Sequence, residues 1–133
     1  MYIRETLTKT IQLERGQLFA EKNGERKLLA TCEPEVEVYE REVPISSIGG
    51  SKHTKRLHYS IMLCDEPLYT REVDADYLYS VSRFTLVADK QRKDGIFERI
   101  TFDNIELANV DKSMVLKFDV VDHKIVDKLL KMI

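Results

Sequence analysis

The chain has 133 residues, of which 43% are hydrophobic and 33% are charged, and its formal net charge is -2 at pH 7. This length predicts a single domain (residues 1–133) that buries roughly 68% of its unfolded surface, so a core can form without disulfide or metal staples. The near-zero net charge excludes a general electrostatic attraction to nucleic acid or to anionic lipid.

The cysteine count and the hydropathy profile bound the class of protein further. Cys32 and Cys64 are too few for a disulfide framework, and we expect both to be buried reduced thiols. The first ten residues, MYIRETLTKT, contain no apolar segment, so no signal peptide is expected. No apolar run approaches the roughly 18 residues of a membrane span. We therefore expect a protein that first folds in a reducing cytoplasm and has no membrane partner.

The first third of the chain alternates apolar and polar residues with a period of two, which is typical of half-buried strands. Residues 7–13 form the first such stretch. Residues 17–22 and 25–31 flank the dipeptide Asn23-Gly24, which supports the two positive φ angles of a type I′ turn. The pattern therefore predicts a strand followed by a hairpin.

The middle of the chain contains two more strand-like stretches separated by a long loop. Residues 35–42 are strand-like, with Val36 and Val38 on one face and Glu35 and Glu37 on the other. Residues 57–63 alternate Leu, Tyr and Ile with polar side chains. The intervening residues 43–56, VPISSIGGSKHTKR, have no such period and are predicted to be a loop. Residues 74–79 are predicted to form one or two helical turns with an Asp cap.

The last third predicts three strands and a terminal helix. Residues 84–88 and 97–107 are separated by a charged turn, and the second stretch changes parity around Asp103-Asn104. A bulge at that pair would bring its apolar residues back to one buried face. A final strand over residues 114–120 leads to a helix capped by Asp122.

The connections between these elements are too short for parallel crossovers, so the sheet is expected to be antiparallel. The predicted fold class is mainly β, an antiparallel β-sandwich or barrel of about seven or eight strands, with a short inner helix and a C-terminal helix.

No constellation of residues in the sequence indicates catalysis. Gly49-Gly50 leads into a strand, whereas a phosphate cradle needs glycines that open a helix. His53, His58 and His123 have no nucleophile motif around them, and surface histidines are the favoured interpretation. No His, Cys or carboxylate spacing is specific for a metal. We expect no enzyme, no cofactor and no metal site.

The 43–56 loop is the strongest functional candidate, because a long loop in a small domain is usually functional or disordered. An acidic strand precedes it and basic residues end it, so the two charges would neutralise each other if the flanking strands pair. The same charges also suit head-to-tail association, in which the basic part of one subunit meets the acidic part of the next. The candidate contact residues in the loop are Val43, Ile45, Ile48, Gly49, Gly50, Lys52, His53, Lys55 and Arg56, and the complementary acidic strand carries Glu33, Glu35 and Glu37.

Two alternatives to subunit assembly remain open at this stage. The loop could fold back on its own domain. The chain could also be a small β-barrel binding module whose basic loop holds a protein or nucleic-acid partner, although a nucleic-acid surface normally gathers positive charge on one face with stacking aromatics.

The order of features resembles that of phage tail tube proteins, particularly those of contractile-tailed phages and phage-like elements of Gram-positive bacteria. The matching segments are GQLFAEKNGERKLLA, EVEVYEREVPISSIGGSKHTKRLHYSIML and GIFERITFDNIELANVDKSMVLKFDVVD. They follow the family's hairpin, its strand, long loop and strand, and its late strand, turn and strand. Together they cover most of residues 17–122.

This resemblance implies a structural protein that assembles into hexameric rings, which stack into a hollow tube related to the tubes of type VI secretion. It implies a location in the virion tail, after assembly in the host cytoplasm. The implied partners are other copies, sheath, tape-measure and baseplate proteins, with DNA only in transit. A terminator or other tail component of the same fold is an alternative. In either case the apolar terminal helix, through Ile125, Leu129 and Ile133, is a candidate for docking on a neighbour.

Overall fold

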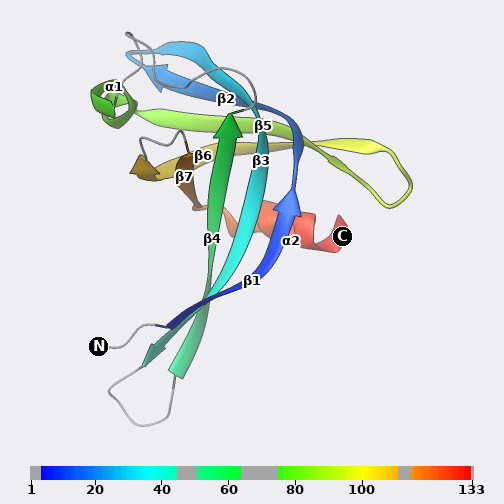
Figure 1. The fold of residues 1–133 in the computed structure, drawn as a ribbon. Coiled ribbons are helices and arrows are strands. Elements are labelled where there is room, and N and C mark those ends of the chain that lie inside the picture. Colours follow the sequence, from blue (N-terminus) through cyan, green and yellow to red (C-terminus); the bar gives the residue numbers. More distant parts are fainter. Residues whose placement is uncertain (1–3, 45–50, 64–74, 111–114, 133) are drawn as a thin grey trace.

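The computed structural model describes residues 4–44, 51–63, 75–110 and 115–132, which form seven strands and two helices (Figure 1). The elements in chain order are β1 (Arg4–Gln12), β2 (Glu14–Lys22), β3 (Glu25–Pro44), β4 (Ser51–Leu63), α1 (Ala75–Ser80), β5 (Arg83–Gln91), β6 (Phe97–Val110), β7 (Val115–Val120) and α2 (His123–Met132).

The strands form a closed antiparallel barrel. β3, β2, β5, β6, β7 and β4 follow one another in the sheet, and β4 pairs back to β3 to close the circle. All of these pairings are antiparallel, and β1 is added to the circle through β3. The prediction of a mainly β, antiparallel fold with an inner and a C-terminal helix is therefore confirmed, with the sheet closing as a barrel.

β3 is the strand that organises the molecule. It has 20 residues, where the sequence predicted two shorter strands. Its first part, up to Cys32, pairs with β2, and its second part, from Cys32 to Pro44, pairs with β4. β1 pairs with the same side of β3 as β2 does, farther along β3. Gln12 of β1 lies opposite Glu35, and Arg4 lies opposite Glu42. Cys32 and Pro34 are both buried, so the alternation runs unbroken through the join between the two predicted strands.

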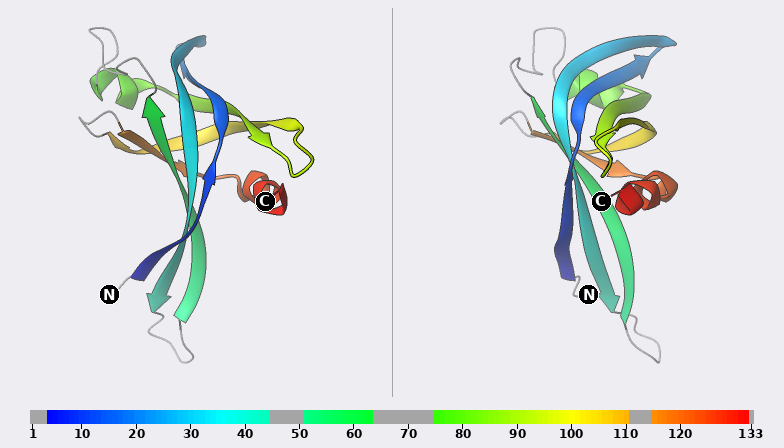
Figure 2. Two further views of the ribbon diagram at one scale, coloured as in Figure 1. Left: turned by 45° about the vertical axis from the view of Figure 1, so that its right-hand side comes forward. Right: turned by 90° about the vertical axis from the view of Figure 1, so that its right-hand side faces the viewer.

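Three strand ends project together from the barrel as a narrow sheet, which we call the arm (Figures 1 and 2). The arm comprises residues 4–9 of β1, 38–44 of β3 and 51–57 of β4. It separates from the barrel where β1 gives way to β2. Arg15 there has a φ of 49°, and its guanidinium lies 3.2 Å from Asp89 and 4.2 Å from the centre of the Phe97 ring.

Inward-facing residues of the strands fill the barrel. The rings of Tyr59 and Phe102 meet edge to face at 4.4 Å, and those of Phe84 and Phe118 at 5.1 Å. Such aromatic pairs add about 0.5–1.5 kcal/mol each beyond the area they bury. Tyr59 is fully enclosed, and this burial raises the pKa of its phenol well above the ordinary value.

The local signals in the sequence are confirmed. Asn23 and Gly24 have φ angles of 53° and 78°, as the type I′ hairpin requires. The pairing of β5 with β6 shifts by one residue opposite Asp103-Asn104, so the residues on both sides of this bulge, Phe102 and Ile105, are buried. The predicted cap of the inner helix, Asp74, lies outside the described residues.

The C-terminal helix packs on the core of its own chain. The Asp122 carboxylate caps it by accepting a hydrogen bond of 3.0 Å from the backbone N–H of Lys124. Val126 and Leu129 are buried, and Ile125 packs against the same cluster. Of the three residues considered for docking on a neighbour, Leu129 is therefore occupied within the chain, Ile125 is partly so, and Ile133 lies outside the described residues.

Candidate functional site

The predicted contact loop is shorter than expected, because its two ends are strands. The polar composition of residues 51–56 hid this in the sequence, since they lack an apolar alternation, and pairing with β3 is what makes them extended. Val43 belongs to β3, Lys52, His53, Lys55 and Arg56 belong to β4, and Ile45, Ile48, Gly49 and Gly50 lie outside the described residues.

The register of this hairpin sets the acidic strand against the basic strand of the same chain. Glu40 lies opposite Lys55, Glu42 opposite His53, and Glu37 opposite His58. Opposite charges in directly paired positions of an antiparallel ladder attract each other. The two strands therefore do pair, and the register places acidic and basic residues at opposite positions of one hairpin.

The arm has an unpaired edge on each flank. Among the described residues, no strand pairs with β1 on the side away from β3. β7 covers the other edge of β4 only from His58 to Met62, so no described strand pairs there with residues 51–57. Unpaired edges present rows of backbone N–H and C=O groups that can accept a further strand. The arm is thus a three-stranded sheet open on both sides.

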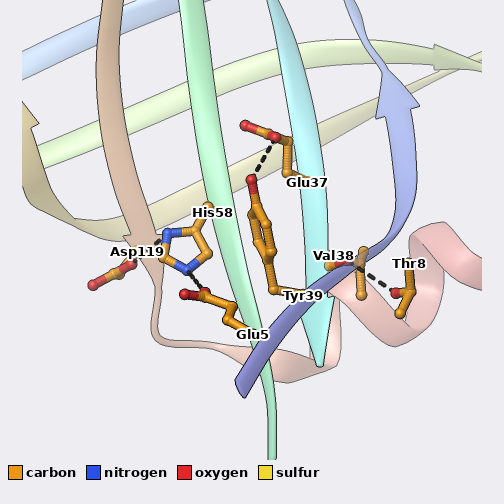
Figure 3. A network of polar contacts seen from close by, with 7 residues as sticks. All are labelled: Glu5, Thr8, Glu37, Val38, Tyr39, His58 and Asp119. Atoms are coloured by element: carbon orange, nitrogen blue, oxygen red, sulfur yellow. Dashed lines mark hydrogen bonds and ion pairs between the residues drawn. The ribbon is translucent and has the colours of Figure 1, made fainter. Parts of the chain in front are cut away.

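A polar network ties the root of the arm to the barrel (Figure 3). Nε2 of His58 on β4 lies 3.2 Å from an oxygen of Glu5 on β1, and its Nδ1 lies 3.2 Å from an oxygen of Asp119 on β7. The hydroxyl of Thr8 donates a hydrogen bond of 2.9 Å to the carbonyl of Val38. Both imidazole nitrogens therefore face carboxylates from other strands. The network joins four strands, β1, β3, β4 and β7, at the point where the arm leaves the barrel.

Tyr39 completes this network from β3. Its ring meets the His58 ring edge to face at 4.8 Å, and its hydroxyl donates a hydrogen bond of 2.8 Å to the Glu37 carboxylate. Burial, this hydrogen bond and the surrounding carboxylates raise the pKa of Tyr39 to about 12. The sequence predicts a surface position for His58. Its neighbours Leu57 and Tyr59 are both buried, so the alternation indicates that His58 faces outward. It cannot indicate the partners of His58, because they lie on other strands.

The predicted acidic strand does form an exposed row on the barrel. Glu33 is exposed, and Glu35 and Glu37 are half-buried, while Cys32, Pro34 and Val36 between them point inward. We call Glu33, Glu35 and Glu37 the acidic face.

A groove of about 380 Å³ runs over the outside of β2, β5 and β6 and reaches Arg26 at the start of β3. Three arginines from three strands line it, namely Arg26, Arg83 and Arg99, together with Phe19 and Thr85. We call these five residues the arginine face. Glu21 and Asp103 also line the groove. The arginines lie 16 or more positions apart in sequence, so only the strand order brings them together.

Metal binding, membrane spanning and similarity to known proteins give no indication of the function. Within the described ranges, no group of three or more His, Cys, Asp or Glu side chains could hold a metal ion. No helix in the part of the chain described here is long and apolar enough to cross a membrane. Comparisons with protein-family models, with curated proteins and with solved structures found no match.

Proposed function

We propose that the chain is a self-assembling structural subunit of a phage or prophage tail, either a tube subunit or a closely related tail component. Copies of the chain associate head to tail into rings. The other partners are tail proteins such as sheath, tape measure or baseplate, and the assembled protein lies in the virion tail. The observation that carries this proposal is the arm, a three-stranded sheet that leaves a closed barrel with both of its edges unpaired.

The two open edges differ, which favours head-to-tail contact. One edge belongs to β1 and the other to residues 51–57 of β4. A strand that pairs with one edge of a neighbour leaves its own second edge free for the next copy. Contacts between two different surfaces repeat from copy to copy and close into rings or extend into filaments. The network around His58 supports this role by fixing the arm at its root.

The binding-module alternative has less support. Its basic residues lie opposite acidic ones within the same hairpin, with Glu40 facing Lys55 and Glu42 facing His53. A surface for nucleic acid gathers positive charge with stacking aromatics and binds in a strongly salt-dependent way. The paired charges of the arm favour a protein contact made through backbone edges.

Two shortened hairpins test this proposal, because the register shows where each can be closed. Glu42 lies opposite His53, so replacing residues 43–52 by Asn-Gly closes a two-residue turn and shortens the arm. Pro44 lies opposite Ser51, so replacing residues 45–50 by Asn-Gly removes the loop and keeps both strands. We expect the first variant to remain monomeric and the second to assemble, as seen by electron microscopy of concentrated protein.

The barrel itself is the internal control, since β4 pairs with β7 only from His58 onward. Both variants should keep the far-ultraviolet circular dichroism of the parent chain. Rings or tubes from the shortened arm at the parent's concentration would contradict the proposal. Loss of assembly in the second variant alone would instead assign the contact to residues 45–50.

A further inference from the structure

The acidic face needs a positive counterpart other than the basic strand. The hairpin register already places basic residues opposite carboxylates of the same chain, as with Lys55 and Glu40. Glu33 and Glu35 lie nearer the barrel, opposite Met62 and Ser60, so no basic residue stands across from them on β4. A contact with another copy that uses these carboxylates would need a positively charged surface on that copy.

The arginine face has the properties of such a surface. Nε of Arg83 donates a hydrogen bond of 2.8 Å to the backbone carbonyl of Asp103, and the Arg26 guanidinium lies 4.1 Å from the centre of the Phe19 ring. These contacts orient the two guanidinium groups, and both arginines also lie opposite Glu21 of β2 in the sheet, Arg26 on one side and Arg83 on the other. Arginine and aromatic residues of this kind are enriched at protein interfaces.

The charge of the groove is mixed but remains positive. Its lining contains Arg26, Arg83 and Arg99 against Glu21 and Asp103. Arg99 also lies 3.6 Å from Asp89, a carboxylate that Arg15 approaches to 3.2 Å. Asp89 thus stands between two guanidinium groups. Thr85 and the half-buried Phe19 supply neutral surface between the charges.

The strand order sets the two faces on different sides of the barrel. The arginine groove lies over β2, β5 and β6, whereas Glu33, Glu35 and Glu37 lie on the part of β3 that pairs with β4, and β4 in turn pairs with β7. One subunit therefore cannot bring its own acidic row into its own groove. Complementary surfaces separated in this way favour repeating contacts between copies.

We propose that the arginine face of one copy receives the acidic face of a second copy, with Arg26, Arg83 and Arg99 binding the carboxylates of Glu33 and Glu35. This inference rests on the proposed function, since it names the surfaces through which neighbouring copies recognise each other. Guanidinium–carboxylate pairs are directional and charge-assisted, so they set the orientation of the neighbour. Salt weakens the association, because exposed charges are screened.

Charge reversal on one face at a time tests the pairing. The variant Arg26→Glu/Arg99→Glu makes the groove repel the acidic face, and Glu33→Lys/Glu35→Lys makes the acidic face repel the groove. Each variant alone is expected to associate at least about tenfold more weakly than the parent chain in sedimentation velocity. Mixing the two is expected to restore association, since each reversed face then meets an oppositely charged face on the other variant. A matched control, Lys124→Glu/Lys131→Glu on exposed positions of α2, makes the same change in net charge and should assemble like the parent.

The outcomes separate this inference from the proposed function. If both variants assemble as well as the parent, the pairing of faces is wrong and the role as an assembling subunit stands. If each variant is monomeric and the mixture is also monomeric, the two faces do not meet and the inference again fails. If the parent chain never associates, both proposals fail. Should a reversal variant lose its circular dichroism, the neutral pairs Arg26→Gln/Arg99→Gln and Glu33→Gln/Glu35→Gln replace it, each with a smaller expected loss of association.

Discussion

Gly16 is the tightest point between β2 and β3. A Cβ at this position would lie 2.6 Å from Cδ of Pro34 and 2.8 Å from the backbone carbonyl oxygen of Cys32. Neither neighbour is the end of a flexible side chain, so the backbone itself would have to move. This contact lies where β3 passes from pairing with β2 to pairing with β4.

We therefore expect Gly16→Ala to lower the free energy of unfolding by about 1–3 kcal/mol, the usual cost of overpacking a core. Urea denaturation followed by circular dichroism measures it. The neighbouring substitution Gln17→Ala, at an exposed position of the same strand, should stay within about 0.5 kcal/mol of the parent. Equal stability of the two variants would show that the strands relax freely at Gly16.

At the scale of elements, the sequence predicted what short-range chemistry determines. The Asn23-Gly24 turn, the bulge at Asp103-Asn104 and the Asp122 cap each depend on a few adjacent residues, and each is confirmed. The length of β3 and the extension of β4 back to Ser51 were missed, because both depend on pairing partners elsewhere in the chain.

The residues of the candidate site also divide into those that the sequence predicts and those that it does not. The row of Glu33, Glu35 and Glu37 could be predicted, since a period of two places all three on one side of a strand. The arginine face and the contacts of His58 could not. Arg26 on β3, Arg83 on β5 and Arg99 on β6 come together only when β3, β2, β5 and β6 are known to follow one another in the sheet.

The C-terminal helix gives a prediction at this scale, because its apolar side packs on the core of its own chain. Leu129 has 0% exposure, so Leu129→Ala should lower the free energy of unfolding by about 2–5 kcal/mol through lost burial and the cavity left behind. The exposed neighbour Asp127 serves as the control, with Asp127→Ala expected within about 0.5 kcal/mol. Unchanged stability together with a loss of assembly would mean that Leu129 docks on a neighbouring subunit after all.

At the scale of the whole molecule, two features motivate the proposal that copies of the chain contact one another. The arm projects from the closed barrel with two edges with which no described strand pairs. The lining of the arginine groove carries more positive than negative groups, and the acidic face lies on a different part of the sheet. A catalytic role would need convergent reactive groups in a pocket. The proposed assembly uses extended surfaces instead.

Sedimentation velocity of the unmodified chain over a wide range of concentration shows directly whether the chain assembles with itself. A self-assembling subunit is expected to show the 15.5 kDa monomer at low concentration and a discrete, much larger species as concentration rises, with longer assemblies beyond it. Raised salt should shift this transition to higher concentration. A single 15.5 kDa species at every concentration and at low salt would contradict the proposal that the chain is a self-assembling subunit.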